Sequence, residues 1–483
     1  MALLQASPDA LAAAARRVMA RCEELARVTA TPGTVERVYL SPEHARVNRL
    51  AAEWMRELGM RTWQDAAGNQ CGRIEPARAH VRTLARPAPR WERLDDAPAA
   101  SPHERRGIPR ASDDPAEILR GPRESPTLVH RPSEHPALML GSHLDTVLDA
   151  GKYDGIVGVL IALEVIRLVR VPVEGGWAVP LPFAIEAVAF SDEEGTRFGK
   201  ALLGSSAVAG DWNDAWWELT DADGVTLRRA FLEFGLDPSR IGEAARRPDE
   251  LVGYLEAHIE QGPELDRAGE PLAVVSSIAS ARRFQLVVEG EARHAGGTPY
   301  DMRHDALLGA SEAALAVERI CAAEHHIVGT VGRFEAFPGA VNVIPGEVQF
   351  SLDLRGEFDG TRDHAWSALS RELDAIMARR GLRWRAREVH NAPAVFCAPL
   401  LQDVVRTGIG SVLPARAEDA PVIFSRAGHD GMAIGAITDV GMLFLRNPDG
   451  ISHHPDEAVS GRDVGLGIRA LAEAVLHLAA EPR

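Results

Sequence analysis

Apolar residues recur at helical spacing near the start of the chain. Residues 9–28 predict an amphipathic helix whose apolar face carries Leu11, Ala14, Ala15 and Val18. A second stretch of the same kind predicts a helix over residues 43–58. Each helix is expected to turn one face to a core and the other to water.

The pattern changes to alternating strands and helices from about residue 136. The apolar run PALML predicts a short strand that enters the polar turn GSHLDTV. Residues 156–170 predict a helix with a broad apolar face, and LPFAIEAVAF predicts a buried strand ending in SDEEG. A strand, a helix and a strand at this spacing imply a parallel pair with a right-handed crossover. In such sheets ligands gather at the carboxyl ends of the strands, where both polar clusters lie.

A different order of elements begins at about residue 283. The segments FQLVVEGEA, IVGTVGRFEAF, EVQFSLDLR and RWRAREV predict strands, and residues 305–323 and 364–381 predict helices. That β-α-β-β-α-β order fits a compact sheet with two helices. From about residue 396 the first pattern resumes, with helices near LLQDVVRTGI and over residues 461–479. We therefore predict an α/β fold with a mostly parallel central sheet in residues 1–282 and 396–483, and an inserted α+β domain in residues 283–395.

One long segment interrupts the larger domain. Residues 76–136 hold eleven prolines and eleven arginines and show no apolar periodicity. Proline at this density prevents helices and sheet ladders, so we predict a long surface loop. A functional arm is the alternative interpretation.

Composition and charge narrow the function classes. The formal net charge is −16, which disfavours a nucleic-acid backbone as partner. The four cysteines are scattered without a C-x-x-C spacing, which is typical of a reducing compartment and argues against a thiolate zinc site. The N-terminal basic residues follow the apolar stretch, unlike a secretory signal, and no apolar run reaches membrane-spanning length. We expect a cytoplasmic protein without membrane contact.

Candidate metal ligands occur in five motifs. These motifs are HLD after the first strand, KYDG, SDEEG after the second strand, HIEQG and GISHHPDE. Imidazole and carboxylate without thiolate suit zinc, manganese, nickel or cobalt, and they do not distinguish among these metals. The candidate ligands and their neighbours are His143, Asp145, Asp154, Glu193, Glu194, His258, His453 and His454.

A pair of divalent cations at these residues would explain the tandem acids. Such cations lower the pKa of a bound water, so that hydroxide exists near neutral pH. One of the two adjacent glutamates would hold a metal and the other would act as general base. Each motif alone is more often structural: HIEQG can hold a core histidine, and acids after a strand are commonly a solvated loop. Their combination at strand ends favours the metal site.

The set of motifs resembles a known family. GSHLDTV, GKYDG, SDEEGTRF, HIEQGP, HAGGTPYDMRHDA, NVIPGEVQFSLDLR, AGHDG and GISHHPDE occur in the order found in the di-metal aminoacylase and carboxypeptidase superfamily. Within it, the chain is similar to the branch of N-carbamoyl-L-amino acid hydrolases, β-ureidopropionases and allantoate amidohydrolases. The motifs span residues 137 to 460, and the histidine of HIEQG separates this branch from the peptidases, which usually have an acid there.

The resemblance implies a role for each candidate ligand. Asp154 is expected to bridge two divalent ions, zinc or manganese, with nickel or cobalt as options. His143 and His258 would complete one ligand set, and Glu194 and His453 the other. The family pattern selects His453 over its neighbour His454, although two adjacent histidines leave that choice open.

The resemblance also implies catalytic residues beside the metals. Glu193 would be the general base and proton shuttle. Asp145 would orient the imidazole of His143, a common arrangement in metal sites.

Substrate contacts are implied for the inserted domain, which resembles a lid and dimerisation domain. His294 would stabilise the oxyanion, often from the neighbouring subunit, and would thereby also contact substrate. Asn342 and Arg355 would grip a substrate carboxylate, for which a guanidinium fork is well suited. Gln261 would contact substrate or bond only to the backbone. Without the resemblance, Arg355 could equally be an exposed cation on a strand, and His294 would more often be an ordinary loop histidine.

These roles imply a hydrolase that cleaves a linear ureido or carbamoyl C–N bond in a homodimer. LDAGKYDGIVGVL together with SHHPDE looks most similar to allantoate-type members, so allantoate is the expected substrate. N-carbamoyl-L-amino acids, or a β-ureidopropionase activity, are the alternative. A dipeptidase or aminoacylase would share the metal centre but not His258. A non-catalytic binding protein would lack a ligand or Glu193, and the sequence retains all of them.

Overall fold

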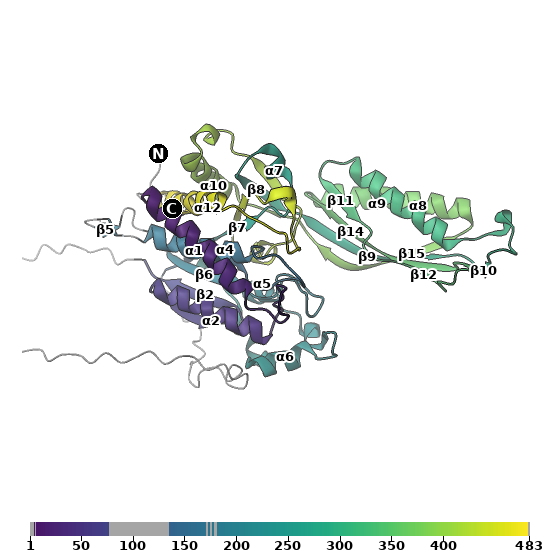
Figure 1. Ribbon diagram of the computed structural model, residues 1–483, viewed down its shortest axis with the longest axis horizontal. Helices are drawn as coiled ribbons and strands as arrows, with labels where there is room; N and C mark the ends of the chain where they lie inside the picture. Colours follow the sequence, from purple (N-terminus) through teal and green to yellow (C-terminus); the bar gives the residue numbers. More distant parts are fainter. Residues whose placement is uncertain are drawn as a thin grey trace, which may run out of the picture.

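The computed structural model describes residue 4 and residues 6–76, 135–170, 172–173, 176–177 and 181–481. The loop predicted for residues 76–136 therefore lies outside the described residues except at its two ends. The described chain forms a larger lobe around a nine-stranded sheet and a smaller lobe around a five-stranded sheet (Figure 1).

The central sheet is largely parallel in its middle, as predicted. Neighbouring strands β6, β3, β7 and β18 all run in one direction. Towards the edges β2, β1, β8 and β16 pair antiparallel, and β17 lies parallel beside β8. The order is β1 (Arg61–Gln64), β2 (Gln70–Ile74), β6 (Ala184–Phe190), β3 (Ala137–His143), β7 (Leu251–Ile259), β18 (Val440–Leu445), β8 (Leu272–Ile278) and β16 (Val395–Phe396), with β17 (Val422–Ser425) off this path.

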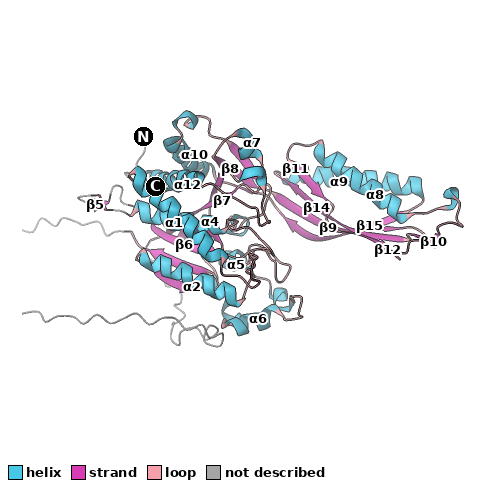
Figure 2. Ribbon diagram, in the orientation of Figure 1, coloured by secondary structure: helices cyan, strands magenta, loops and turns pink. Residues whose placement is uncertain are grey.

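Long helices cover one face of this sheet and short helices the other (Figure 2). The first face packs against α1 (Pro8–Ala26), α2 (Pro42–Glu57), α4 (Ile156–Val169), α10 (Pro399–Val412) and α12 (Gly461–Ala480). The second face packs against α5 (Leu203–Ala209), α7 (Glu264–Ala268) and α11 (Gly431–Ile434). The helices predicted at 9–28, 43–58, 156–170 and 461–479 are thus confirmed with small shifts at their ends. None of the described helices has the length and apolarity needed to cross a membrane.

The smaller lobe is an antiparallel sheet with two helices on one face (Figure 1). Its predicted strand at 327–337 is two strands in the structure, because the chain leaves the ladder between β11 and β12 and both pair with β14. The elements are β9 (Ser280–Glu289), α8 (Ala306–Ala322), β11 (Ile327–Thr330), β12 (Phe334–Phe337), β14 (Glu347–Gly356), α9 (Asp359–Arg380) and β15 (Arg383–Ala392). A small ladder, β10 (Arg293–His294) with β13 (Val343–Ile344), lies beyond one end of this sheet.

The chain passes between the two sheets twice, at neighbouring places. Ile278 pairs with Val395 in the central sheet, and Ala281 pairs with Ala392 in the smaller one. The crossings are therefore residue 279 and residues 393–394, side by side. The predicted domain boundaries after residues 282 and 395 lie close to these crossings and stay predictions.

Candidate active site

The carboxyl ends of the parallel strands carry most of the predicted site residues. His143 is the last residue of β3, and Glu193 and Glu194 follow β6 in the turn SDEEG. His258 is the penultimate residue of β7. Because β6, β3 and β7 are parallel neighbours, these side chains reach one edge of the sheet.

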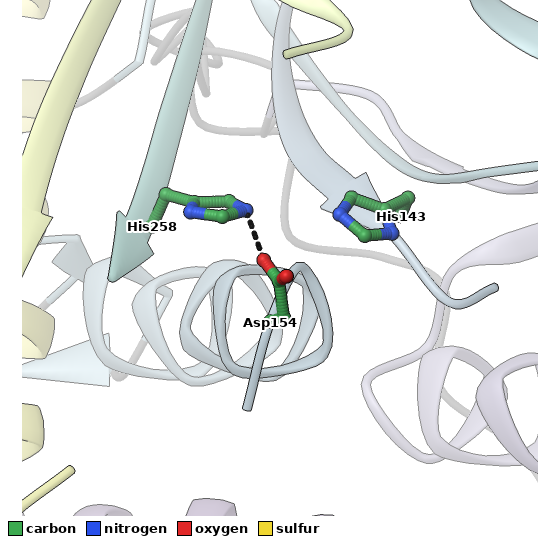
Figure 3. A group of neighbouring side chains, drawn as sticks. All are labelled: His143, Asp154 and His258. Carbon is green, nitrogen blue, oxygen red and sulfur yellow. Dashed lines mark ion pairs between the residues drawn. The ribbon is translucent and has the colours of Figure 1, made fainter. Parts of the chain in front are cut away.

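Asp154 and His453 enter the same place from two loops. Asp154 precedes α4, and its Oδ1 lies 3.2 Å from His258 Nε2 (Figure 3). Its other oxygen, Oδ2, lies 3.1 Å from His453 Nε2, and that nitrogen is 3.5 Å from Glu194 Oε1. The described residues form four groups of potential metal-ligating atoms, each with all its atoms within 4.8 Å of one another, and two of these groups share Asp154. These two are His143, Asp154 and His258, and Asp154, Glu194 and His453.

The hydrogen bonds of His258 show that these residues fit a cation. Its Nδ1 lies 2.9 Å from the carbonyl oxygen of Ile259 and donates to it, while its Nε2 accepts the backbone N–H of Gly155 at 3.1 Å. Nε2 therefore carries no proton and cannot donate to Asp154 Oδ1, a buried oxygen that accepts no hydrogen bond from the described residues. Two buried acceptors facing each other are unfavourable, and a cation held by both removes the conflict.

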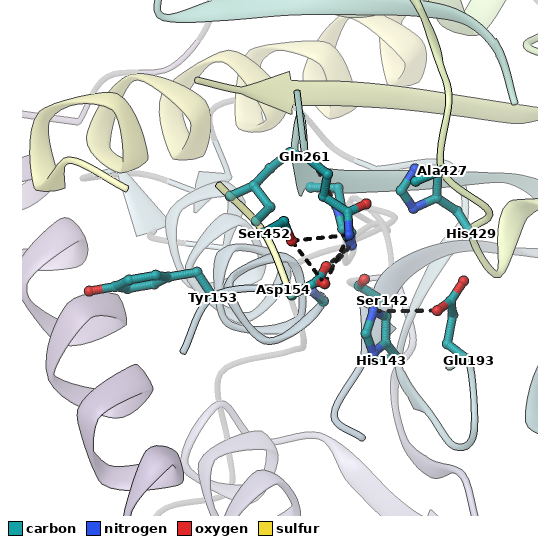
Figure 4. Close-up of polar contacts among 12 residues, drawn as sticks. Ser142, His143, Tyr153, Asp154, Glu193, Gln261, Ala427, His429 and Ser452 are labelled. Carbon is teal, nitrogen blue, oxygen red and sulfur yellow. Dashed lines mark hydrogen bonds and ion pairs between the residues drawn. The ribbon is translucent and has the colours of Figure 1, made fainter. Parts of the chain in front are cut away.

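His143 is oriented in the same way. Its Nδ1 lies 3.1 Å from the carbonyl oxygen of Asp145, so Nε2 faces the cluster and lies 3.9 Å from Glu193 Oε2 (Figure 4). Gly155 leaves space for this ring, because a Cβ at that position would come within 2.3 Å of His143 Nε2. The strand end and the glycine turn therefore fix the imidazole from two sides.

Asp145 connects the loop after β3 with the loop after β6. Its Oδ1 and Oδ2 accept the backbone N–H groups of Glu193 and Glu194, each at 3.1 Å. The carboxylate lies 3.6 Å from His143 Nδ1, farther than the carbonyl oxygen of Asp145 itself. Asp145 thus holds the two glutamates at least as directly as it holds the imidazole.

Glu193 is buried beside the cluster, and its Oε2 lies 3.9 Å from His143 Nε2. Burial raises the pKa of the Glu193 carboxyl well above its ordinary value, and the Glu194 carboxylate adds to this rise while His143 opposes it. The carboxyl is therefore in an environment suited to taking up and releasing a proton.

The structure distinguishes the two adjacent histidines. His453 joins the cluster, whereas Nδ1 of His454 accepts the backbone N–H of Asp456 at 3.1 Å and its side chain is exposed. His453 has a positive φ of 55°, a conformation that costs free energy for a residue with a Cβ. Gln261 shares this backbone conformation with φ 55°.

Gln261 converges on the same carboxylate as His453. Its Nε2 donates to Asp154 Oδ2 at 2.8 Å and lies 3.4 Å from His453 Nε2 (Figure 4). Its Oε1 is buried and has no partner among the described residues. The side-chain amide thus belongs to the cluster and bonds to more than the backbone.

Two further buried residues adjoin the cluster: Glu256, which had no predicted role, and His429, whose motif AGHDG suggested only an undefined supporting role. Glu256 lies two positions before His258 on β7 and accepts the Ser142 hydroxyl at 2.6 Å. His429 packs edge-on against His258 with ring centroids 4.4 Å apart, and the Ser425 hydroxyl lies 2.7 Å from its Nε2. Glu256, His258 and His429 form another group of close potential ligands. The two-residue period of a strand was the only sequence signal for Glu256.

The predicted residues of the smaller lobe lie at opposite ends of its sheet. Arg355 is at the end of β14 near the larger lobe, where its Nη1 donates to the carbonyl oxygen of Arg426 at 2.8 Å. His294 of β10 lies at the far ladder, and Asn342 directly precedes β13, where its carbonyl accepts the N–H of Ala295 at 3.0 Å. Strand β14 separates the two ends by about 25 Å at a rise of roughly 3.3 Å per residue. Within one chain, His294 and Asn342 are therefore not brought to the cluster.

Relatives among characterised proteins cover nearly the whole chain. An allantoate deiminase of Arabidopsis thaliana is 33% identical over 480 residues, which is 94% of this chain and 81% of the relative. An N-carbamoyl-L-amino acid amidohydrolase of Geobacillus stearothermophilus is 32% identical over 464 residues, which is 96% of this chain and 98% of the relative.

Solved structures share the fold over a similar span. A hydantoinase/carbamoylase family amidase from Burkholderia multivorans superposes with a TM-score of 0.76 at 27% identity, covering 97% of this chain and 98% of that one. AtUAH in complex with glyoxylate superposes with a TM-score of 0.71 at 25% identity, covering 98% and 100%. Residues 139–477 match the sequence profile of peptidase family M20/M25/M40. The chain belongs to this peptidase family, M20/M25/M40, and is a hydrolase.

Proposed function

We propose that the enzyme hydrolyses a linear ureido or carbamoyl C–N bond in a small carboxylate, with allantoate as its substrate. The observation that carries this proposal is the convergence of His143, Asp154 and His258 with Glu194 and His453 next to a buried glutamate. It is supported by full-length relatives named for activity on allantoate and on N-carbamoyl amino acids.

Two divalent cations, zinc or manganese, are the cofactors that we assign to these residues. His143, Asp154 and His258 would hold one, and Asp154, Glu194 and His453 would hold the other. When bound, such cations supply a Lewis acid and make water a stronger nucleophile near neutral pH. The hydrogen bonds that Nδ1 of His143 and of His258 makes to backbone carbonyls already orient both imidazole rings.

Glu193 is the general base and the proton shuttle in this proposal. Its carboxylate takes a proton from the attacking water and returns it to the leaving nitrogen. Asp145 positions Glu193 by accepting its backbone N–H at 3.1 Å. Both residues are buried, which keeps bulk water from competing for the proton.

Arg355 provides the contact to the substrate carboxylate. Its Nε and Nη2 donate to Asp353 at 3.1 Å each, and its Nη1 donates to the Arg426 carbonyl at 2.8 Å. A guanidinium has five N–H groups, so the outer edge formed by Nη1 and Nη2 keeps two of them for an incoming carboxylate. The solved relative AtUAH was crystallised with glyoxylate, itself a small carboxylate.

His294 and Asn342 act from a second copy of the chain. Both are exposed at the distal end of the smaller lobe, about 25 Å along the sheet from Arg355. We therefore propose a homodimer formed through the inserted domain, residues 283–395, in which His294 of one copy donates to the oxyanion in the other. Gln261, which already bonds to Asp154, contacts the substrate from the larger domain.

The second candidate substrate class is the N-carbamoyl-L-amino acids. It is favoured by the Geobacillus stearothermophilus relative, which is 32% identical and covered over 98% of its length. β-Ureidopropionase activity is a variant of this class, and dipeptidase or aminoacylase activity is disfavoured by His258. The four buried thiols fit a reducing compartment, and we place the enzyme in the cytoplasm without nucleic-acid or membrane partners.

A substrate panel on metal-reconstituted protein tests the proposal. Allantoate, N-carbamoyl-L-amino acids, N-carbamoyl-β-alanine, dipeptides and N-acyl amino acids are compared by ammonia release or amine appearance. We expect allantoate to give the highest kcat/KM, with complete loss after chelation and recovery on addition of Zn²⁺ or Mn²⁺. Preference for N-carbamoyl-L-amino acids would select the second candidate, and preference for dipeptides would contradict both.

A further inference from the structure

A buried carboxylate joins two loops that carry proposed metal ligands. Glu457 is only 4% exposed. Its Oε1 accepts the backbone N–H of Tyr153 at 2.8 Å and that of Asp154 at 3.0 Å. The donors lie about three hundred positions away in sequence, in the turn that presents Asp154. One glutamate of the C-terminal segment thus fixes the backbone of that turn.

The second oxygen of Glu457 faces the other loop. Oε2 accepts the hydroxyl of Ser452 at 2.9 Å, and Ser452 immediately precedes His453. The same hydroxyl lies 3.3 Å from Asp154 Oδ2 (Figure 4). Because His453 has a φ of 55°, its loop needs contacts of this kind to hold a conformation that L residues disfavour.

The turn before Asp154 is shaped to admit this side chain. A Cβ on Gly151 would lie 2.3 Å from the Cδ and Oε1 of Glu457. Neither carboxylate oxygen is a member of the close groups of potential metal ligands. Glu457 therefore does not touch the reacting atoms and acts through the two loops.

We propose that Glu457 is a positioning residue of the metal centre, which sets the spacing between Asp154 and His453 before any cation binds. The proposal rests on the proposed function for the identity of the metal ligands, and it adds a residue that the motif roles do not include. Removing partners of metal ligands typically weakens metal binding about 10- to 100-fold.

The test measures metal binding and not turnover. Apo-protein is titrated calorimetrically with Zn²⁺ or Mn²⁺ for wild type and Glu457→Gln. Glutamine retains the volume and one acceptor oxygen but loses the second acceptor. We expect affinity for at least one of the two ions to fall about 10- to 100-fold. The result is independent of substrate identity, so a failed substrate panel leaves it standing.

Glu164→Gln is the matched control. Glu164 is also buried, with 1% of its side chain exposed. It lies on α4 and pairs with Arg17 and Arg21 of α1, on the face of the central sheet that the long helices cover. We expect this change to lower the melting temperature of apo-protein and to leave metal affinity unchanged. An equal loss of metal affinity in Glu164→Gln and Glu457→Gln would overturn the proposal. The loss in Glu457→Gln would then reflect a general destabilisation of the fold.

Two further variants probe the same contact. Ser452→Ala removes the hydrogen bond to Oε2 that Glu457→Gln also removes, and it should weaken metal binding by a comparable factor. Gly151→Ala should also weaken binding, and its effect should shrink in the Glu457→Gln background because both changes disturb one contact. Wild-type affinity in folded Glu457→Gln and Ser452→Ala would refute the positioning role.

Discussion

The strand-end cluster and the distal ladder of the smaller lobe are held in opposite ways. His143 and His258 are buried, and each ring is fixed by a hydrogen bond to a backbone carbonyl. His294 is exposed, and its Nδ1 accepts the N–H of Gly297, three residues further along the same loop. Contacts between distant segments thus fix the side chains of the cluster, whereas the imidazole of His294 is held by its own loop.

The difference distinguishes the residues proposed to bind cations from those proposed to contact the substrate. Atoms that bind cations must be aimed before the ions arrive, since lone pairs in a dry site are costly without a partner. On the proposed function, the exposed His294 would meet its partners only when a second copy and the substrate are present. Mutations in the two regions should therefore differ in whether metal is retained and whether a partner copy can compensate.

The largest effect is expected for Glu193→Gln in the buried cluster. Loss of the base should lower kcat by about 10²- to 10⁴-fold, because proton transfer is worth roughly that factor. Metal content by elemental analysis should stay at the wild-type level, since Glu193 is not among the five proposed ligands. Unchanged kcat would contradict the assignment of the base.

A smaller effect is expected for His294→Ala at the distal ladder. Removal of one oxyanion donor should lower kcat by about 10²- to 10³-fold, with folding and metal content unaffected. His325→Ala, another exposed histidine of the same lobe, serves as control and should match wild type. Wild-type turnover by His294→Ala would remove this residue from the mechanism.

Mixing these variants sharpens the comparison further. If His294 acts across copies, co-refolded Glu193→Gln and His294→Ala chains form mixed dimers in which one site has both residues intact. Activity should then rise well above that of either variant alone. The absence of any rise in verified mixed dimers would place His294 in the site of its own chain.

The smallest effect is expected for Arg355→Lys. An ammonium cannot form the paired hydrogen bonds of a guanidinium with Asp353 and a substrate carboxylate together. KM should rise about tenfold while kcat changes little, as expected for a loss of binding near 1.4 kcal/mol. Steady-state kinetics would contradict the carboxylate contact if KM stayed constant and only kcat fell.

The sequence predicted the parts of the fold whose pattern is uniform. Residues 8–26 and 137–143 read clearly as helix and strand because their apolar spacing is regular. Strand β7 was not predicted, because the buried polar residues Glu256 and His258 interrupt its apolar run. Those residues are where the function resides, so the local pattern is weakest at the site itself.

The candidate site was predictable as far as its motifs extend. His143, Asp154 and His453 stand in recognisable strings, and the structure brings them together. The contact of Glu457 with the N–H groups of Tyr153 and Asp154 was not predictable, since its partners are backbone groups about three hundred positions away. The same holds for the carboxylate of Asp145, whose partners are the backbone N–H groups of Glu193 and Glu194.

The chain crossings at residue 279 and residues 393–394 join the smaller lobe to the larger one through two neighbouring connections. Ala281 and Ala392 form the last rung of one ladder, and Ile278 and Val395 the first rung of the next. A rotation at these few residues would move the smaller lobe as one body and leave both hydrophobic cores intact. If Arg355 contacts the substrate as proposed, the same short stretch of backbone would set its position relative to the metal-ligand cluster.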